Sequence, residues 1–186
     1  PFDAVALMRD LVLLNRPNAA MKGLELTLHV APELTAQDAG ATIADTHRVR
    51  QILANLLGNA LKFTVRGRVE ARIELSASGR LAVEVADTGP GLTAEELDSA
   101  FEPFSRIART SAGTSGAGLG LSLSRQLARL MGGELSGHSA LGVGSCFRLE
   151  LPYNPAATPE REPDLTPDAS ATAPETHRRL RVLIAE

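Results

Sequence analysis

Apolar residues recur three and four positions apart in three segments of the chain, and this spacing predicts three amphipathic helices. The first follows Asp3, a good helix-capping residue, and we expect Pro17 to break or kink it. The second follows Asp45, and the third ends at Gly132-Gly133. The apolar positions are Val5, Met8, Leu11, Val12 and Met21 in the first helix, Val49, Ile52, Leu53, Leu56, Leu57 and Leu61 in the second, and Leu119, Leu123, Leu127 and Leu130 in the third.

Alternation of apolar and polar residues predicts several strands around these helices. Ser78-Gly79 joins two of the strands as a β-hairpin. A short helix follows at Thr93, where Glu96 completes a capping box. The predicted strands cover residues 24–29, 41–44, 69–75, 81–85, 134–138 and 145–151. Helices and strands together indicate an α/β sandwich.

The composition of the chain changes after the last predicted strand. Residues 1–152 form the predicted domain. Residues 153–179 are rich in Pro, Ala and Thr and contain too few apolar groups to fold, so we expect a linker there. Residues 180–186 contain a buried-strand pattern that indicates the start of a following domain. The chain also begins without Met, and we interpret it as a piece of a longer protein.

Composition argues against several classes of function. Aromatic residues make up 3% of the chain and the formal net charge is -3, so we expect no nucleic-acid partner. No segment approaches the roughly 20 apolar residues of a membrane span, which predicts a cytoplasmic segment without membrane contact. Cys146 is the single cysteine, and its alternating surroundings fit a strand residue better than a reactive thiol.

Two carboxamides, Asn55 and Asn59, lie one turn apart on the polar face of the second predicted helix, and Lys62 follows on the same side. An amide oxygen is a hard, neutral ligand suited to Mg²⁺, and an ammonium group can contact a phosphate. An asparagine pair on a helix is more often solvated or bonded to a loop. The asparagine pair therefore indicates a magnesium site only when it is taken together with the loops that follow it.

Two glycine-rich segments supply the remaining chemistry. Asp87 ends an apolar strand and opens the run DTGPG, where its carboxylate can accept a hydrogen bond from an exocyclic amine such as that of adenine; an ordinary turn is the alternative. Residues 113–121, GTSGAGLGL, lead directly into the third helix, and backbone N–H groups at a helix N-terminus bind phosphate. A Rossmann motif lacks its preceding strand here, and a Walker-type loop lacks its Gly-Lys-Ser/Thr run. The segments favour ATP with Mg²⁺.

In this order the segments resemble the catalytic ATP-binding domain of sensor histidine kinases, within the GHKL superfamily shared by gyrase, Hsp90 and MutL. The resemblance covers roughly residues 1–152 and depends on four boxes. These are the N box at 50–64, RQILANLLGNALKFT; a glycine box at 87–92, DTGPGL; the F box at 101–104, FEPF; and a second glycine box at 116–121, GAGLGL. It implies the Bergerat fold, a two-layer α/β sandwich in which a mixed sheet of about five strands packs against three helices.

The resemblance also implies roles for individual side chains. Asn59 would be the main magnesium ligand, with Asn55 assisting from the same helix face. Asp87 would accept the adenine amine, and Ser145 would reach the base through water.

Lys62 and Arg106 would bind phosphate oxygens and complete the catalytic set with the two asparagines. The loop of residues 103–117 would be an ATP lid. The nucleotide-binding positions that the resemblance implies are Asn55, Asn59, Lys62, Asp87, Gly89, Gly91, Gly116, Ala117, Gly118, Leu119, Gly120, Leu121 and Ser145.

None of the histidines has the His-Glu-x-x-Arg-Thr-Pro-like surroundings of a phosphoacceptor; they are His29, His47, His138 and His177. We therefore predict a protein-histidine kinase domain that donates the γ-phosphoryl group of ATP to a histidine on a separate dimerisation domain of the same protein. Residues 180–186 indicate a hybrid kinase, with a downstream receiver domain or response regulator as partner. One alternative is an ATPase clamp of the Hsp90 or gyrase type, which has a glutamate where Asn55 stands. Another is a regulatory nucleotide-binding domain without kinase activity.

Overall fold

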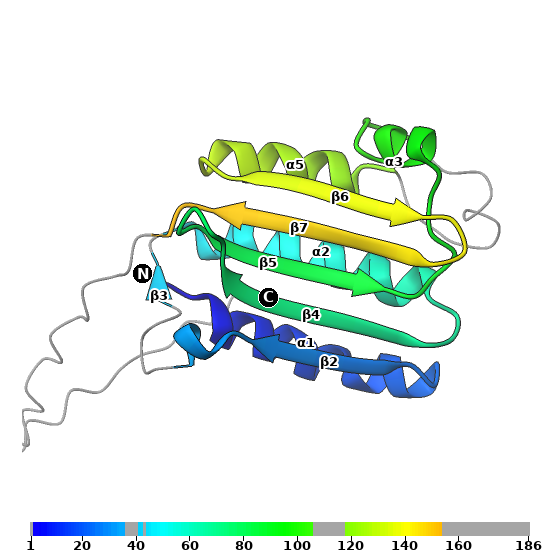
Figure 1. The fold of residues 1–186 in the computed structure, drawn as a ribbon, viewed down its shortest axis with the longest axis horizontal. Coiled ribbons are helices and arrows are strands. Elements are labelled where there is room, and N and C mark those ends of the chain that lie inside the picture. Colours follow the sequence, from blue (N-terminus) through cyan, green and yellow to red (C-terminus); the bar gives the residue numbers. More distant parts are fainter. Residues whose placement is uncertain (1, 36–40, 43, 106–117, 154–186) are drawn as a thin grey trace, which may run out of the picture.

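The fold is a five-stranded sheet with its long helices on one face, seen in the computed structural model for residues 2–35, 41–42, 44–105 and 118–153 (Figure 1). The strand order is β2-β4-β5-β7-β6. β2 pairs with β4 in parallel and all other neighbours are antiparallel, so the sheet is mixed. The five strands are β2 (Glu25–Val30), β4 (Arg68–Leu75), β5 (Leu81–Asp87), β6 (Glu134–Ala140) and β7 (Gly144–Leu151).

Three long helices, α1 (Ala4–Met21), α2 (Thr46–Phe63) and α5 (Gly120–Leu130), cover this sheet from behind in Figure 1. α1 contacts β2, α2 contacts β4 and β5, and α5 contacts β6 and β7. The short helix α3 (Ala94–Ala100) lies against β6, and a 3-10 turn (Pro32–Leu34) contacts β4. The predicted two-layer sandwich is thereby confirmed.

A second, two-stranded sheet pairs β1 (Phe2–Asp3) with β3 (Ala41–Thr42) in antiparallel fashion. Most of the remaining predicted elements occur near their expected bounds, including the capping box of Thr93 and Glu96. Among the described residues, no helix combines the length and the apolar character needed to cross a bilayer.

α2 is the central element of the core because both its ends are fixed and its apolar face is fully covered. The Asp45 side chain accepts hydrogen bonds from the backbone N–H groups of His47 and Arg48 at 3.1 and 3.2 Å, as an N-cap should. At the other end, Lys22 Nζ donates to the carbonyl oxygen of Leu61 at 2.6 Å. The buried side chains of α2 are Val49, Ile52, Leu53, Leu56, Leu57, Ala60 and Leu61.

α1 differs from its prediction at Pro17, which lies inside the helix and does not end it. Pro17 lacks the N–H that would bond the carbonyl one turn earlier. That carbonyl belongs to Leu13, whose side chain is 62% exposed, so this stretch of α1 faces solvent. The predicted break is therefore wrong, and Pro17 is accommodated within a stretch of α1 whose residues are largely exposed.

α5 is the third predicted helix, but the leucines that predicted it do not mark its buried face. Of the four, only Leu127 is buried, whereas Leu130 is 76% exposed. The side chains of α5 that turn inward are instead Ser122, Ser124, Leu127 and Ala128. One of the two buried serines, Ser124, places its hydroxyl group beside α2, where it contacts Asn55.

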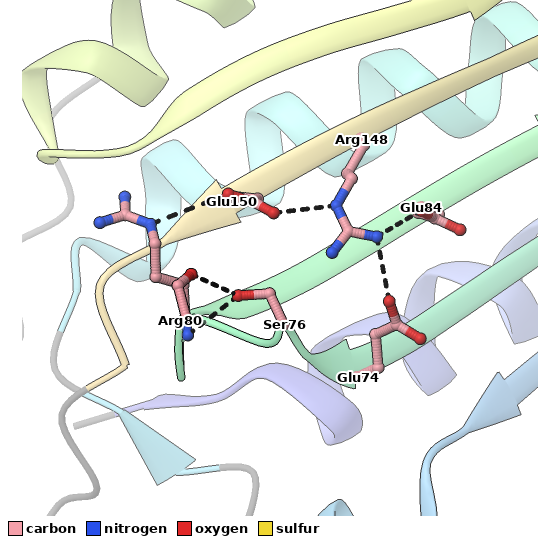
Figure 2. Close-up of polar contacts among 7 residues, drawn as sticks. Glu74, Ser76, Arg80, Glu84, Arg148 and Glu150 are labelled. Atoms are coloured by element: carbon pink, nitrogen blue, oxygen red, sulfur yellow. Dashed lines mark hydrogen bonds and ion pairs between the residues drawn. The ribbon is translucent and has the colours of Figure 1, made fainter.

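The face of the sheet opposite the helices is polar and centred on Arg148 of β7 (Figure 2). Its guanidinium group donates to Glu74 and Glu150 at 3.0 Å each and also bonds Glu84. Partial burial alone would lower the pKa of Arg148, but the hydrogen bonds that it donates to these carboxylates raise it. The Arg148 cluster, defined as these four residues, thus joins β4, β5 and β7 across the outer face.

Candidate functional site

A chain of side-chain amides lies on the face of α2 that points toward α5. Asn55 Nδ2 donates to Ser124 Oγ at 3.0 Å, and Asn59 Nδ2 approaches Asn55 Oδ1 at 3.4 Å. Both atoms of the Asn55 amide are therefore engaged within the protein. Because the nitrogen of Asn59 is turned to Asn55, its Oδ1 remains as the acceptor that Asn59 offers elsewhere.

The start of α5 lies close to this chain of amides at Gly120. A Cβ atom there would overlap the side-chain oxygen of Asn55, so a larger residue would require the Asn55 amide to shift. Gly120 was predicted to contact phosphate, and in the structure it also leaves room for the Asn55 amide.

Asp87 is the last residue of β5, and its carboxylate is half-buried. Gly89 N donates to Asp87 Oδ1 at 2.8 Å. Burial raises the pKa of Asp87 above its ordinary value, although hydrogen bonds from the backbone of Gly89 and Ser145 act in the opposite direction. The carboxylate keeps capacity to accept a further hydrogen bond.

Asp87 belongs to a polar row that crosses three strands. It pairs with Ser145 of β7, and Ser145 pairs with Ser139 of β6. The two serine oxygens lie 2.9 Å apart. Ser139 Oγ also accepts from Leu92 N at 2.8 Å and donates to the carbonyl of Gly144 at 2.9 Å. All three side chains lie on the helix-facing side of the sheet, because they share a row of the pleat.

The polar row and the amide chain meet in one open pocket of about 70 Å³ between α2, β5, β7 and α5. Most of its wall is apolar, and Asn59, Asp87 and Ser145 are its side chains with polar ends. The lining residues are Asn59, Ala60, Phe63, Asp87, Pro90, Gly91, Leu92, Ala100, Leu121, Ser145 and Phe147.

One wall of the pocket depends on Gly91. Gly91 is buried with a φ of 63°, and a Cβ atom there would overlap the carbonyl of Ala140. The Gly142 N–H donates to the carbonyl of Pro90 at 2.7 Å. The turn between β6 and β7 is thus fastened to the loop after β5, which fixes that loop against the pocket.

The back of the pocket is aromatic. Phe147 lines it, and Phe101 packs edge-on against Phe147 with ring centroids 6.1 Å apart. The guanidinium of Arg125 lies 4.9 Å from the centroid of the Phe101 ring. Phe101, the first residue of the FEPF segment, thereby connects α3 and α5 to the pocket wall.

The structure brings a large part of the predicted site together. Five predicted positions line the same pocket: Asn59, Asp87, Gly91, Leu121 and Ser145. Asn55, Gly89 and Gly120 touch residues of that pocket or of the amide chain. Gly118 and Leu119 immediately precede α5.

Lys62 is on α2 as predicted, but it does not line the pocket. Its ammonium group lies 5.0 Å from the centroid of the Phe63 ring. Arg106, Gly116 and Ala117 lie outside the described residues, as do most of the predicted lid and everything beyond 153.

Sequence reasoning did not identify Ser124, Ser139 or the aromatic residues Phe63 and Phe147. A signal for the two serines does exist. Ser139 follows Leu135 and Gly137 on the inward side of its strand, and Ser124 lies on the buried side of α5. A polar side chain at an inward position requires a hydrogen-bond partner, which marks it for attention.

Comparison with known proteins gives a consistent result. Residues 44–155 match the family described as histidine kinase-, DNA gyrase B-, and HSP90-like ATPase. The aerobic respiration control sensor protein ArcB of Escherichia coli (strain K12) is 37% identical over 153 residues, which are 81% of this chain and 19% of ArcB. The chain therefore spans about a fifth of the length of this curated relative.

Solved structures agree with the sequence comparison. Full-length ShkA, crystallised in complex with AMPPNP, superposes with a TM-score of 0.73 at 38% identity, covering 87% of this chain and 32% of ShkA. The nucleotide-free catalytic domain of histidine kinase ThkA superposes with a TM-score of 0.69 at 25% identity, covering 83% of this chain and 95% of that domain.

Proposed function

Because the chain belongs to the histidine kinase-, DNA gyrase B-, and HSP90-like ATPase family and has the fold of a histidine-kinase catalytic domain, we propose that it binds ATP with Mg²⁺ and donates the γ-phosphoryl group to a histidine on a separate domain. The observation that carries this proposal is the convergence of Asn59, Asp87 and Ser145 in one pocket.

Asp87 is the proposed contact for the adenine base. A half-buried carboxylate at the rim of an apolar pocket pairs with an exocyclic amine, and the apolar wall of Phe63, Leu92 and Phe147 suits the faces of a purine ring. A 6-oxo purine would place an oxygen against the Asp87 carboxylate, and two acceptors repel.

Asn59 is the proposed ligand of magnesium, and the donor chemistry of the site fits such an ion. Its Oδ1 is a hard neutral oxygen that the contact of Nδ2 with Asn55 leaves available. Among the described residues no group of three or more His, Cys, Asp or Glu could bind a metal, so the ion would depend on the amide oxygen together with phosphate oxygens. When bound, magnesium would neutralise charge on the phosphates.

The remaining roles concern position rather than proton transfer. Phosphoryl transfer needs alignment and charge neutralisation more than it needs a strong base. We assign Lys62 and Arg106 to the phosphates, with Gly116, Ala117, Gly118, Leu119 and Gly120 placed around them. Asn55 cannot take a proton from water, which disfavours rapid hydrolysis and favours transfer to a protein group.

We further propose that the chain acts with a dimerisation domain of the same protein that carries the acceptor histidine. The strand-like pattern of residues 180–186 supports a following receiver domain, as in a hybrid kinase, and a receiver domain or response regulator would be the next acceptor. Residues 153–179 would be the linker between them.

The test uses ATP labelled at the γ-phosphate, incubated with the chain alone and then together with the separately expressed histidine-bearing domain of the same protein. We expect binding without appreciable autophosphorylation or hydrolysis by the chain alone, and acid-labile label on the added domain. An Asn59→Ala chain should transfer no label in the same mixture.

Two other results would each change the assignment. Acid-labile label on the chain alone would mean that one of its own histidines is an acceptor. Rapid phosphate release by the chain alone would favour an ATPase clamp.

A further inference from the structure

Ser139 has three polar partners and only one proton. Its Oγ lies 2.8 Å from Leu92 N, 2.9 Å from the carbonyl oxygen of Gly144 and 2.9 Å from Ser145 Oγ. A hydroxyl group offers one donor and two acceptor lone pairs, so these three partners saturate it.

The direction of each bond follows from what the partners can do. The Leu92 N–H can only donate and the Gly144 carbonyl can only accept. Ser139 therefore gives its proton to Gly144 and accepts from Leu92. Its remaining lone pair can be satisfied only by the hydroxyl proton of Ser145.

Ser145 is consequently left without a proton for the pocket that it lines. Its oxygen can accept from the pocket but cannot donate into it. Asp87, its cross-strand neighbour, is a carboxylate and likewise accepts. These two side chains at this edge of the pocket therefore both present acceptors.

We infer that Ser139 is a specificity-determining residue that acts through Ser145, by fixing it as an acceptor so that the pocket selects a purine with a 6-amino group over one with a 6-oxo group. The inference rests on the proposed function and deepens it. A water that bridges Ser145 to the base would donate one hydrogen to Ser145 and have its other hydrogen for ring atom N1, which accepts in adenine and carries a hydrogen in a 6-oxo purine. Ser139 is a positioning residue, because it contacts Ser145 and the loop rather than the base.

The test measures the affinities of ATP and inosine triphosphate, which differ at the 6-position, in the purified chain and in five variants. In Ser139→Ala the Ser145 hydroxyl can turn and donate into the pocket. We expect the ratio of ATP to inosine triphosphate affinity to fall by roughly threefold to tenfold, the scale of one hydrogen bond. Ser139→Thr keeps the hydroxyl and should keep the ratio, and Ser136→Ala, on the same strand but facing outward, should also keep it.

The fourth variant combines Ser139→Ala with Ser145→Ala and is compared with Ser145→Ala alone. If Ser139 acts through Ser145, the two should have the same ratio. A purely structural role for Ser139 predicts instead that both nucleotides weaken equally and the ratio stays constant, which would overturn the inference. Independent, additive effects of the two serines would overturn it as well.

Failure of the proposed function looks different in the same titrations. A wild-type chain that binds neither nucleotide would contradict the proposed function and this inference together. If the wild-type chain prefers ATP and the Ser139→Ala chain has the same preference, the result would contradict this inference but not the proposed function.

Discussion

At the scale of single residues, Asn59 is the side chain on which metal-dependent binding should depend most. Replacing it with Ala removes the oxygen proposed for magnesium but no core contact, because Asn59 is half-buried and lines the pocket. We expect the affinity for an ATP analogue in magnesium to fall at least about tenfold, with unchanged thermal stability. Calorimetric titration with and without magnesium measures this.

Gln51 supplies the matched control for Asn59, since it is an exposed amide side chain on the same helix. Gln51→Ala should leave the affinity unchanged. Equal affinities of the Asn59→Ala and wild-type chains in magnesium would remove Asn59 from the metal site.

Asp87 should make nucleotide binding sensitive to pH. Burial raises the pKa of Asp87, so its carboxylate takes up a proton at a higher pH than an ordinary aspartate. Protonation removes the acceptor for the amine, and ATP affinity should therefore fall as pH decreases through this raised pKa. Asp87→Asn should weaken ATP binding by on the order of 2 kcal/mol at neutral pH and abolish the pH dependence of ATP affinity. Titrations of both chains across the acidic range decide this.

Asp87 should affect the stability of the folded chain in the opposite direction: stability should fall as pH rises, whereas ATP affinity should fall as pH decreases. A raised pKa in the folded state means that the folded chain binds more protons than the unfolded chain between the two pKa values, so Asp87 lowers stability as pH rises through that window. Asp87→Asn should consequently unfold at an equal or higher temperature at neutral pH. A lower melting temperature would contradict the burial argument.

At the scale of elements, the helices differ in how far the sequence predicted them. α2 was predicted with its cap, its buried face and its polar face, because leucine spacing and amphipathicity are local properties. α5 was predicted as a helix but not in its orientation, since its exposed leucines suggest a face that is not the buried one. Which face of a helix is buried depends on its neighbours, and here the neighbour is the amide side of α2.

The contact between α2 and α5 yields a prediction for Ser124. Its hydrogen bond holds the Asn55 amide in one orientation, and Asn55 in turn orients Asn59. Ser124→Ala frees the chain of amides to rotate, and we expect nucleotide affinity in magnesium to fall by roughly threefold to tenfold. Titrations in magnesium and in EDTA separate an effect on metal binding from an effect on packing, because the loss of nucleotide affinity should appear only with the metal.

Ser122 offers a closely matched control. It is also buried on α5, but its hydroxyl bonds the carbonyl of Leu119 at 3.1 Å within the same segment and does not reach α2. Ser122→Ala should leave magnesium-dependent affinity unchanged. A Ser124→Ala loss of the same size in EDTA would mean that Ser124 supports packing and not the amide chain.

At the scale of the whole molecule, the Arg148 cluster joins three strands of the sheet. The Arg148 side chain is 24% exposed, so removing it leaves the carboxylates of Glu74, Glu84 and Glu150 close together and poorly solvated. We expect Arg148→Met to lower the free energy of unfolding by roughly 1–3 kcal/mol, between the values for exposed and buried ion pairs. Urea denaturation measures this change.

Arg72 provides the comparison for Arg148 on the same face of the sheet. Its side chain is 51% exposed, and the ion pair described for it is with Glu70, at 2.8 Å. Arg72→Met should lower the free energy of unfolding by less than about 1 kcal/mol. Equal losses for the two variants would show that the cluster behaves as independent surface pairs.

The arrangement of the site across the molecule marks the limit of sequence reasoning. The DTGPG run and the asparagine pair are local patterns that could be singled out from the sequence, although their chemistry was favoured only when they were taken together. Ser139 occupies an inward polar position that is visible locally, but its role arises from the register that places it beside Ser145 and, through β7, in line with Asp87. Strand register between distant segments is a tertiary property that no local pattern encodes.

The polar row also has a consequence for folding kinetics. β4 with β5, and β6 with β7, are hairpins of neighbouring strands, whereas β5 and β7 pair across a long stretch of chain. Long-range pairing must overcome a larger loop-closure entropy, so we expect the two hairpins to form first and to dock late. A nucleotide recognises only the docked state, and it should slow unfolding while leaving the folding rate nearly unchanged. Stopped-flow chevrons with and without an ATP analogue should therefore differ in the unfolding limb alone, and an accelerated folding limb would mean that the hairpins dock before the rate-limiting step.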